Sequence, residues 1–470
     1  MVVESTAPPG PGTRAVALLQ GDSRLQLDFP VLAPEISGTP GGTVDLGSGC
    51  WYLHWPIPQA DWELVAAGAP ELVVLGNARV LFGEGEPFVR AIQEIRERLG
   101  GRPVLWAPRV ALPHRLAYLV YVGVDLLDAT ESLWQNRTGV NLDATMGASP
   151  ATISPVDEVA SSLAEELARV RAAAIGGRLR ELVEIRISAE PALAEHLRYA
   201  DRHLATLLEE RTPVVGDGQH RYVLRESRRR PEVQRFVRRI IERYRPPISK
   251  KVLLILPCSK TKPYRASPSH RSYRRALEGL QPIERVHTMS VTSPLGLVPR
   301  ELEDVPPARH YDIPVTGEWD EEERSTVVAA VRHVLSSGAY ESVVVHLDPI
   351  EYAFLRDVSN SHPHSVWSAM DDRTLSPPAL ASLRQAIGDA LESCPPAPGG
   401  PLAVVREELR EIAAVQFGRA AADRLFAPPV RLAGRPWFQR VVDGGGVDLA
   451  TWRDERGLFQ LTVAGARRVA

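Results

Sequence analysis

Cysteine is scarce in this sequence, and its three copies follow no metal-binding spacing. Cys50, Cys258 and Cys394 are odd in number and far apart, and no CxxC pair occurs. This pattern argues against a disulfide framework and against a cysteine-rich zinc site. We therefore predict no metal and no cofactor, and we expect any functional cysteine to act as a thiol.

Long hydrophobic runs are also missing. The most apolar stretches, such as residues 253–256 and 343–345, are far shorter than the roughly 20 residues that a membrane span needs. Residues 1–5 lack the basic and apolar regions of a secretory signal. These absences predict a cytoplasmic protein with no membrane partner.

Lysine is the third scarce residue. Of the 55 lysines and arginines only four are Lys, at positions 250, 251, 260 and 262. Where arginine serves as the general surface cation, we expect lysine at places that a guanidinium group cannot fill. The pKa of an ammonium group can fall on burial, and its neutral form can act as base or nucleophile. This reasoning points to Lys260 and Lys262, whereas Lys250 and Lys251 are expected to flank a strand.

The residues that are present describe a folded chain of several domains. Its 470 residues exceed one ordinary core, and contents of 44% hydrophobic and 24% charged residues exclude a disordered or fibrous chain. The net charge is only −3, but residues 221–251 hold twelve Lys or Arg against three Glu. The run Arg228, Arg229 and Arg230 is a candidate RNA contact, although a solvated helix face explains the pattern equally well.

Apolar periodicity predicts an α/β multidomain protein with four regions. Residues 1–212 alternate short strands and helices, which indicates a (β/α) barrel or a layered sheet. Residues 213–249 form a basic helical connector, and residues 250–394 alternate strands and helices as in an open, mostly parallel sheet. After a proline-rich hinge, residues 402–470 predict a lead helix and a small all-β module.

The central region is predicted to carry the functional site. Ligands of open parallel sheets bind at the carboxyl ends of the strands, where the strand order reverses. We therefore expect the loops that leave these ends to converge on one crevice. They are residues 258–270, 292–320 and 346–349.

The first of these loops contains an ordered motif. It reads Pro257-Cys258, three residues, Lys262-Pro263-Tyr264, two residues, Ser267, two residues and His270. This order resembles the signature of the archaeosine synthase family, and residues 293–317 resemble that family's second conserved block. The resemblance implies an enzyme that acts on tRNA carrying 7-cyano-7-deazaguanine at position 15 of the D-loop. It implies that free L-lysine or another amino donor is added to the nitrile, and that a radical S-adenosylmethionine partner enzyme processes the lysine adduct.

The flanking regions carry further resemblances. Residues 1–212 are similar to the barrel of tRNA-guanine transglycosylases, and that family's nucleophilic aspartate falls at Asp128. The family's Asp-Ser-Gly-Gly-Phe-Gln block and its cysteine-rich zinc segment are not retained, so we expect a degenerate barrel in which Asp128 is a structural relic. Residues 402–470 resemble a PUA domain, a small RNA-binding β-barrel, with Arg435 as an RNA contact.

Addition of an amine to a nitrile requires a deprotonated amine and a proton donor for the nitrile nitrogen. In one route Cys258 attacks the nitrile carbon as a thiolate, helped by nearby cations, and the amine then displaces the sulfur. In a second route the amine attacks directly and Cys258 only packs or hydrogen-bonds. Both routes stay open. Lys262 is predicted to polarise the nitrile or act as an acid. His270 is predicted to shuttle protons, although a histidine here is also an ordinary capping arrangement.

Substrate-binding residues are predicted in the same loops. Arg300 and Glu301 are candidates for holding the carboxylate and ammonium of a free amino acid, with a surface ion pair as the alternative. Asp348 follows a strand and is positioned to hold an amine or a base edge. The remaining candidates are Ser259, Lys260, Tyr264, Ser267 and Ser269.

Two other functions compete with this enzyme. The chain fits an RNA-binding scaffold, in which substitution of Cys258 or Lys262 changes only affinity. It also fits a residual tRNA-guanine transglycosylase, which would require Asp128 for base exchange. The sequence leaves the oligomeric state open, with a homodimer as one option.

Overall fold

The computed structural model describes residues 17–19, 42–47, 49–150, 153–213, 219–313, 317–371 and 373–426. The chain divides into two compact units. The first comprises residues 1–218 and 224–231, and the second comprises residues 219–223 and 232–470. The segment predicted as a connector, residues 213–249, is therefore shared between the two units.

The first unit is built on a six-stranded sheet with the order β1-β6-β5-β4-β3-β2. All neighbours are parallel except β2 and β3. From β2 to β6 each strand lies beside the next in sequence, which is how a β/α barrel winds. Within the described residues the sheet is open, so a parallel α/β unit is confirmed and the barrel stays a prediction. The strands are β1 (Ala17–Leu19), β2 (Thr43–Gly47), β3 (Cys50–Leu53), β4 (Leu72–Leu75), β5 (Val104–Trp106) and β6 (Leu126–Asp128).

One face of this sheet packs against helices, because alternate strand residues such as Leu53, Leu75 and Leu127 point into a large apolar core. Residues 191–211 form two helices that are separated at Leu204. The helices of the unit are α1 (Gln59–Ala67), α2 (Ala78–Glu84), α3 (Glu86–Leu99), α4 (Leu116–Val122), α5 (Thr130–Arg137), α6 (Val156–Ile175), α7 (Leu179–Arg186), α8 (Pro191–His203) and α9 (Ala205–Arg211). A hairpin of β7 (Val140–Asp143) and β8 (Gly147–Pro150) follows α5.

The second unit contains a five-stranded sheet with the order β12-β11-β10-β14-β15. The central strand β10 is parallel to both β11 and β14, and β12 is antiparallel to β11. The chain passes from β10 to β11 on one side and later returns to β14 on the other. The strand order therefore reverses beside β10, where ligands of such sheets bind. The strands are β10 (Val252–Pro257), β11 (Val286–Thr292), β12 (Gly296–Pro299), β14 (Ser342–Val345) and β15 (Ser365–Trp367).

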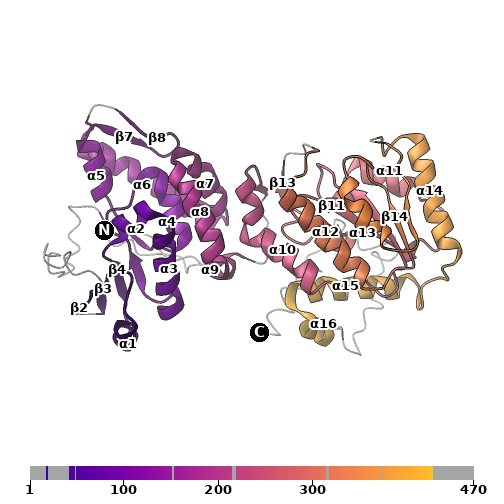
Figure 1. Ribbon diagram of the computed structural model, residues 1–470, viewed down its shortest axis with the longest axis horizontal. Coiled ribbons are helices and arrows are strands. Elements are labelled where there is room, and N and C mark those ends of the chain that lie inside the picture. The colour runs from indigo at the N-terminus through magenta and orange to yellow at the C-terminus, as the bar shows by residue number, and fades with distance from the viewer. Residues whose placement is uncertain are drawn as a thin grey trace. The chain divides into compact units, whose positions relative to one another are not determined.

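Helices cover both faces of this second sheet (Figure 1). Residues Leu253 and Ile255 of β10 join the core formed with α10 (Pro231–Glu242), α12 (Glu321–Ser336) and α15 (Gly400–Phe417). Residues Leu254 and Leu256 join the opposite core, formed with α11 (Pro268–Ala276) and α14 (Pro377–Glu392). The short α13 (Arg356–Asn360) precedes β15. The three-layer arrangement buries β10 on both faces, as its unbroken apolar sequence predicts.

The single lead helix predicted after the hinge is two helices, α15 and α16 (Arg419–Leu425), separated at Gly418 with φ 90°. Three carboxylates of α15 bind the segment before β10. Glu407 accepts from Ser249 N at 2.8 Å, Glu408 pairs with Lys250 at 2.9 Å, and Glu411 accepts from Arg245 N at 3.3 Å. This helix is therefore part of the second unit's core. Most of the stretch predicted as a PUA domain, residues 402–470, lies outside the described residues, which end at 426.

None of the helices in the described ranges is long and apolar enough to cross a membrane.

Candidate active site

Cys258 lies directly after β10, at the carboxyl end of the central strand. Its N–H donates to Val291 O at 3.1 Å, so it sits beside Thr292 at the end of β11. Burial raises the pKa of the Cys258 thiol, while the Thr292 hydroxyl, which can donate to a thiolate, and the charge of Lys262 act in the opposite direction. The charge of Glu351 raises this pKa further. The thiol therefore has a hydroxyl group, a cation and an anion that act on its pKa.

Lys262 is the lysine that shares the surroundings of the thiol. Its Nζ lies 4.1 Å from the ring centroid of Tyr311. Burial lowers the pKa of Lys262, and the charges of Cys258 and Asp312 oppose this change. The other lysines lie elsewhere. Lys260 is exposed, Lys250 pairs with Glu408, and Lys251 lies 3.8 Å from Glu341.

Three hydroxyl groups form a chain beside the thiol. Thr292 donates to Ser293 O at 2.9 Å, and its Oγ1 lies 2.6 Å from the hydroxyl of Tyr311. The Tyr311 hydroxyl in turn bonds that of Tyr264. Because each hydroxyl has one hydrogen, Tyr264 must donate to Tyr311 and Tyr311 to Thr292. A thiolate at Cys258 would offer the Thr292 hydrogen a second acceptor. Tyr311 belongs to β13 (Tyr311–Asp312), which pairs with β9 (His220–Arg221).

His270 stabilises the motif loop, residues 258–270, by contacts with Pro257 and Tyr264. Its Nε2 lies 2.9 Å from Pro257 O, so Nε2 carries the hydrogen, and within the described chain Nδ1 has no hydrogen-bond partner. Its ring stacks on Tyr264 with centroids 5.7 Å apart. Burial lowers the pKa of His270 to about 4, so the imidazole is neutral at pH 7. This geometry favours a structural role for His270 over the predicted role as a proton shuttle.

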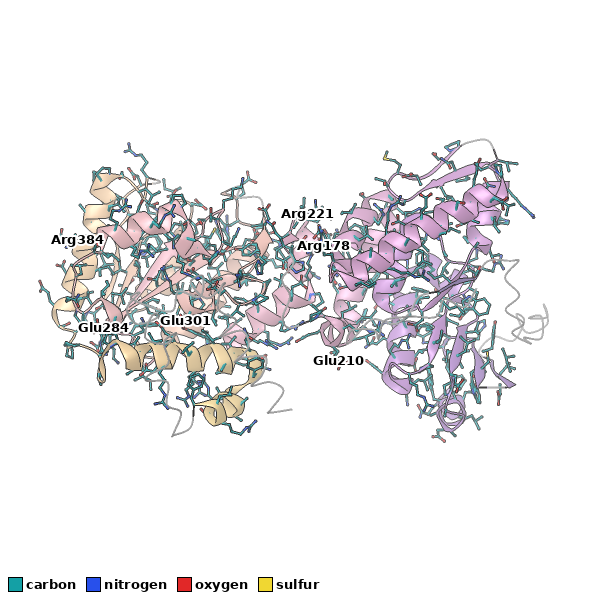
Figure 2. All side chains as sticks on the ribbon, turned by 180° about the vertical axis from the view of Figure 1, so that it is seen from behind. Arg178, Glu210, Arg221, Glu284, Glu301 and Arg384 are labelled. Atoms are coloured by element: carbon teal, nitrogen blue, oxygen red, sulfur yellow. The ribbon has the colours of Figure 1, made fainter. Side chains whose placement is uncertain are left out.

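The prediction that Glu301 holds an amino acid is wrong. Glu301 is 2% exposed and accepts from the Tyr244 hydroxyl at 2.7 Å, and its Oε2 lies 3.0 Å from His287 Nε2. His287 pairs in register with Leu253, near the amino end of β10 and so at the opposite end of the sheet from the thiol. Figure 2 labels Glu301 beside α15, where η7 (Arg300–Leu302) contacts that helix. The preceding Arg300 is half-buried, and its charge acts on His270.

The predicted serines of the motif loop form hydrogen bonds within that loop. Ser267 is 1% exposed and is the N-cap of α11, where its Oγ accepts from His270 N at 3.2 Å and lies 3.1 Å from Ser269 Oγ. Ser259 Oγ donates to Thr261 O at 2.9 Å. These bonds shape the motif loop around the thiol.

Of the four arginines predicted to contact RNA, the three that the structure describes differ in their exposure to solvent. Arg230 is 1% exposed and its Nε donates to Glu184 at 2.8 Å, so the prediction that Arg230 contacts RNA is wrong. Its neighbours Arg228 and Arg229 are half-buried and exposed, respectively, and Arg435 lies outside the described residues.

Asp128 in the first unit has its carboxylate occupied. Oδ2 accepts from Trp106 Nε1 at 3.2 Å and from Arg109 N at 3.0 Å, and Oδ1 accepts from Thr130 N at 2.9 Å. The residue is only 7% exposed. These bonds hold the loop after β6, which agrees with a structural role. Among the described residues, no cluster of three or more His, Cys, Asp or Glu side chains could hold a metal ion.

Sequence reasoning missed several residues that surround the thiol. Thr292 and Tyr311 lie in a loop that was predicted as a whole, and Glu351 and Tyr352 follow the loop of Asp348. The Asp348 Oδ1 accepts from Ile350 N at 2.8 Å and from Glu351 N at 3.3 Å, so it holds the turn that carries Glu351. The sequence indicates only that these residues follow a predicted strand. This position does not reveal which side chains of the loop face the crevice.

The fold and this site define a multidomain α/β protein with a thiol and an ammonium group at the switch point of a parallel sheet. A family model described as "Domain of unknown function (DUF5591)" matches residues 233–387, and "Patch-forming domain C2 of tRNA-guanine transglycosylase" matches residues 407–470. The second match does not bear on a PUA domain, which stays a prediction.

Two archaeosine synthases match most of the chain, and a transglycosylase matches about half of it. "Archaeosine synthase" of Haloferax volcanii is 32% identical over 421 residues, which cover 84% of this chain and 69% of the relative. "Archaeosine synthase subunit alpha" of Methanosarcina acetivorans is 31% identical over 85% of this chain and 68% of the relative. "tRNA-guanine(15) transglycosylase" of Methanothermobacter thermautotrophicus is 28% identical over 47% of this chain and 36% of the relative. The chain belongs to the archaeosine synthase family.

Proposed function

We propose that this chain is a tRNA-modifying enzyme of archaeosine formation that adds an amino donor, L-lysine, to the nitrile of 7-cyano-7-deazaguanine at position 15 of the tRNA D-loop. The observation that carries the proposal is the arrangement at the carboxyl end of β10. Cys258 lies there beside Thr292, and Lys262 lies over the ring of Tyr311, whose hydroxyl bonds Thr292. The charges of Cys258 and Lys262 act on each other's pKa. When a nitrile undergoes addition, a thiol can act as the nucleophile and a neighbouring ammonium group as the proton donor. The named archaeosine synthases among its relatives support the pathway.

In the route that this geometry favours, Cys258 first transfers its proton and attacks the nitrile carbon. Burial lowers the pKa of Lys262, which makes its neutral form a base for the thiol. The new C–S bond turns the nitrile into a thioimidate, and the Lys262 ammonium returns the proton to the nitrile nitrogen. Thr292 donates a hydrogen bond to the thiolate while it exists. The amine then displaces the sulfur.

A second enzyme completes the route, in this proposal. Addition of lysine leaves a lysine adduct, and conversion to archaeosine requires cleavage of that side chain. The resemblance of the motif loop implies a radical S-adenosylmethionine protein for this step. Relatives named "subunit alpha" support the proposal, since the name implies another subunit in those proteins.

The test is amine transfer to a tRNA bearing the nitrile base. The protein is incubated with this tRNA and isotopically labelled L-lysine, and the digested nucleosides are examined by mass spectrometry. We expect a lysine adduct with wild type and with Cys394→Ala, which removes a buried thiol at the end of α14. We expect none with Cys258→Ala. Parallel incubations with ammonia and glutamine identify the donor, and absence of any adduct with all three would contradict the proposal.

A further inference from the structure

The loop after β14 brings a carboxylate to the thiol that the motif does not contain. Residues 346–355 follow β14, which lies beside β10 at the point where the strand order reverses. Glu351 is half-buried in this loop, and its negative charge acts on the pKa of Cys258 after burial has raised it. Tyr352 is 5% exposed and belongs to the apolar core against which Cys258, Trp319 and Phe354 also pack. Burial raises the pKa of Tyr352, and the charge of a Cys258 thiolate raises it further.

The carboxylate of Glu351 is held in place by neutral groups. Trp319 Nε1 donates to Glu351 Oε1 at 3.1 Å. The backbone N–H of Glu351 donates to Asp348 Oδ1 at 3.3 Å, which fixes the turn. Within the described parts of the chain, no Lys, Arg or His forms an ion pair with Glu351. An oriented carboxylate of this kind is a group prepared for a cation from outside the chain.

The ring of Trp319, which binds this carboxylate, packs against two further aromatic rings. The ring centroids of Trp319 and Tyr352 are 5.5 Å apart at 60°, and those of Trp319 and Phe354 are 5.5 Å apart at 51°. Tyr352 and Phe354 are 6.2 Å apart. Aromatic faces next to a carboxylate are the combination that recognises an ammonium group.

A carboxylate next to a nucleophilic thiol opposes formation of the thiolate. This arrangement becomes useful when a positive charge lies beside Glu351 during the reaction. The incoming amine supplies that charge, since a free lysine side chain has a pKa of about 10.4 and enters the site as an ammonium ion. It must lose one proton before it can attack.

We propose that Glu351, with Trp319 and Tyr352, forms the subsite that binds the ammonium group of the amino donor beside Cys258 and accepts its proton. This inference rests on the proposed function. Glu351 takes one proton from the ammonium group, and the free amine attacks the thioimidate carbon. The C–S bond breaks as the C–N bond forms, which yields an amidinium ion and a thiolate. The thiolate takes the proton back from the Glu351 carboxyl group, so that the thiol and the carboxylate are both restored.

The test uses Glu351→Gln in the full chain, which removes the charge and keeps an acceptor for Trp319. Asp357→Asn is the matched control, because it removes an exposed carboxylate from α13. The first readout needs no substrate. Alkylation of Cys258 by iodoacetamide is followed against pH by peptide mass spectrometry. We expect the apparent pKa of the thiol to fall in Glu351→Gln and to stay unchanged in Asp357→Asn.

The second readout is amine transfer with varied donor. We expect Glu351→Gln to raise the KM for L-lysine about tenfold or more, with the KM for tRNA unchanged. With hydroxylamine, a donor that is neutral at the working pH, the effect of the substitution should be absent. Should Glu351→Gln fail to fold, Trp319→Phe removes the indole N–H donor, keeps a smaller aromatic ring and should raise the same KM.

The outcomes separate this subsite from the proposed function. An unchanged KM for lysine in a variant that transfers amines overturns the subsite and leaves the proposed function standing. An unchanged alkylation profile also overturns it. If wild type transfers no amine at all while the alkylation profile shifts as expected, the proposed function fails and the contact between carboxylate and thiol survives.

Discussion

The two sheets of this chain both place a reactive side chain at the carboxyl end of a parallel strand, and they surround it differently. The Asp128 carboxylate after β6 accepts three hydrogen bonds from its own loop and an adjacent segment. Cys258 after β10 has around it a lysine with a lowered pKa and a carboxylate without an ion-pair partner in the described residues. Strand-end position therefore does not by itself indicate catalysis. A side chain becomes a candidate nucleophile where its own loop does not use it for structural hydrogen bonds and ionisable groups lie around it.

The largest expected effect on the rate of amine transfer comes from replacing each of these two side chains separately. We expect Cys258→Ala to lower amine transfer at least about a thousandfold, since the covalent route loses its nucleophile. Asp128→Asn should leave the rate within about threefold, because it changes a loop contact outside the site. Single-turnover transfer of labelled lysine to tRNA measures both. A Cys258→Ala variant within tenfold of wild type would indicate direct attack by the amine and break the contrast.

The second effect concerns the cation. Lys262→Met should lower the rate by about 10²- to 10⁴-fold, the range of general acid–base catalysis. Lys262→Arg should not restore it, because a guanidinium group does not release its proton. The exposed Lys260 provides the control, and Lys260→Met should stay within about twofold. Equal losses at both positions would point to tRNA binding instead of chemistry.

The third effect tests the hydroxyl chain. Thr292→Val should slow transfer about tenfold, the value of one hydrogen bond of about 1.4 kcal/mol. The pKa of Cys258 should rise in this variant, because the thiolate loses a donor. Thr292→Ser should restore both. Thiolate ultraviolet absorbance against pH, in a background without Cys50 and Cys394, measures the pKa, and an unchanged titration would rule out a Thr292 contact.

The smallest effect on catalysis is expected for substitution of His270. This substitution is expected to change the free energy of unfolding instead. The pKa of His270 is lowered by burial to about 4, below the 6.5 of an ordinary histidine. Between these two values the unfolded chain binds a proton that the native chain does not, so the free energy of unfolding decreases as pH falls through this window. The free energy of unfolding that His270 costs the protein between pH 6.5 and about 4 is about 3 kcal/mol.

His270→Gln removes this contribution. The pH dependence of the unfolding free energy should be shallower in His270→Gln than in wild type between pH 6.5 and about 4. Chemical denaturation of the two proteins across that range measures the difference. His196 and His346, whose pKa values burial also lowers, act equally in both proteins. Parallel pH dependences would contradict a buried neutral His270.

Sequence reasoning succeeded where the site is local in the chain. Cys258, Lys262 and Tyr264 come from one loop that follows an apolar strand, and the position of that loop follows from strand order alone. Thr292, Tyr311 and Glu351 come from three further segments. Their meeting with the thiol depends on tertiary packing, for which the sequence carries no periodic signal.

The error at Glu301 has a topological cause. The sequence predicts residues 292–320 as one loop at the carboxyl end of the sheet. In the structure β12 carries the chain back antiparallel along β11, which takes Glu301 to the opposite end. The error at Arg230 has a different cause, since composition cannot reveal that Glu184 buries one arginine of a basic run.

The reactivity of Cys258 towards iodoacetamide as a function of pH, in wild type and in Lys262→Met, tests the pairing of thiol and ammonium most directly. It requires neither tRNA nor knowledge of the donor. The pairing predicts that the apparent pKa of the thiol rises when the ammonium group is removed, because its charge lowers that pKa. Identical profiles in the two proteins would contradict it.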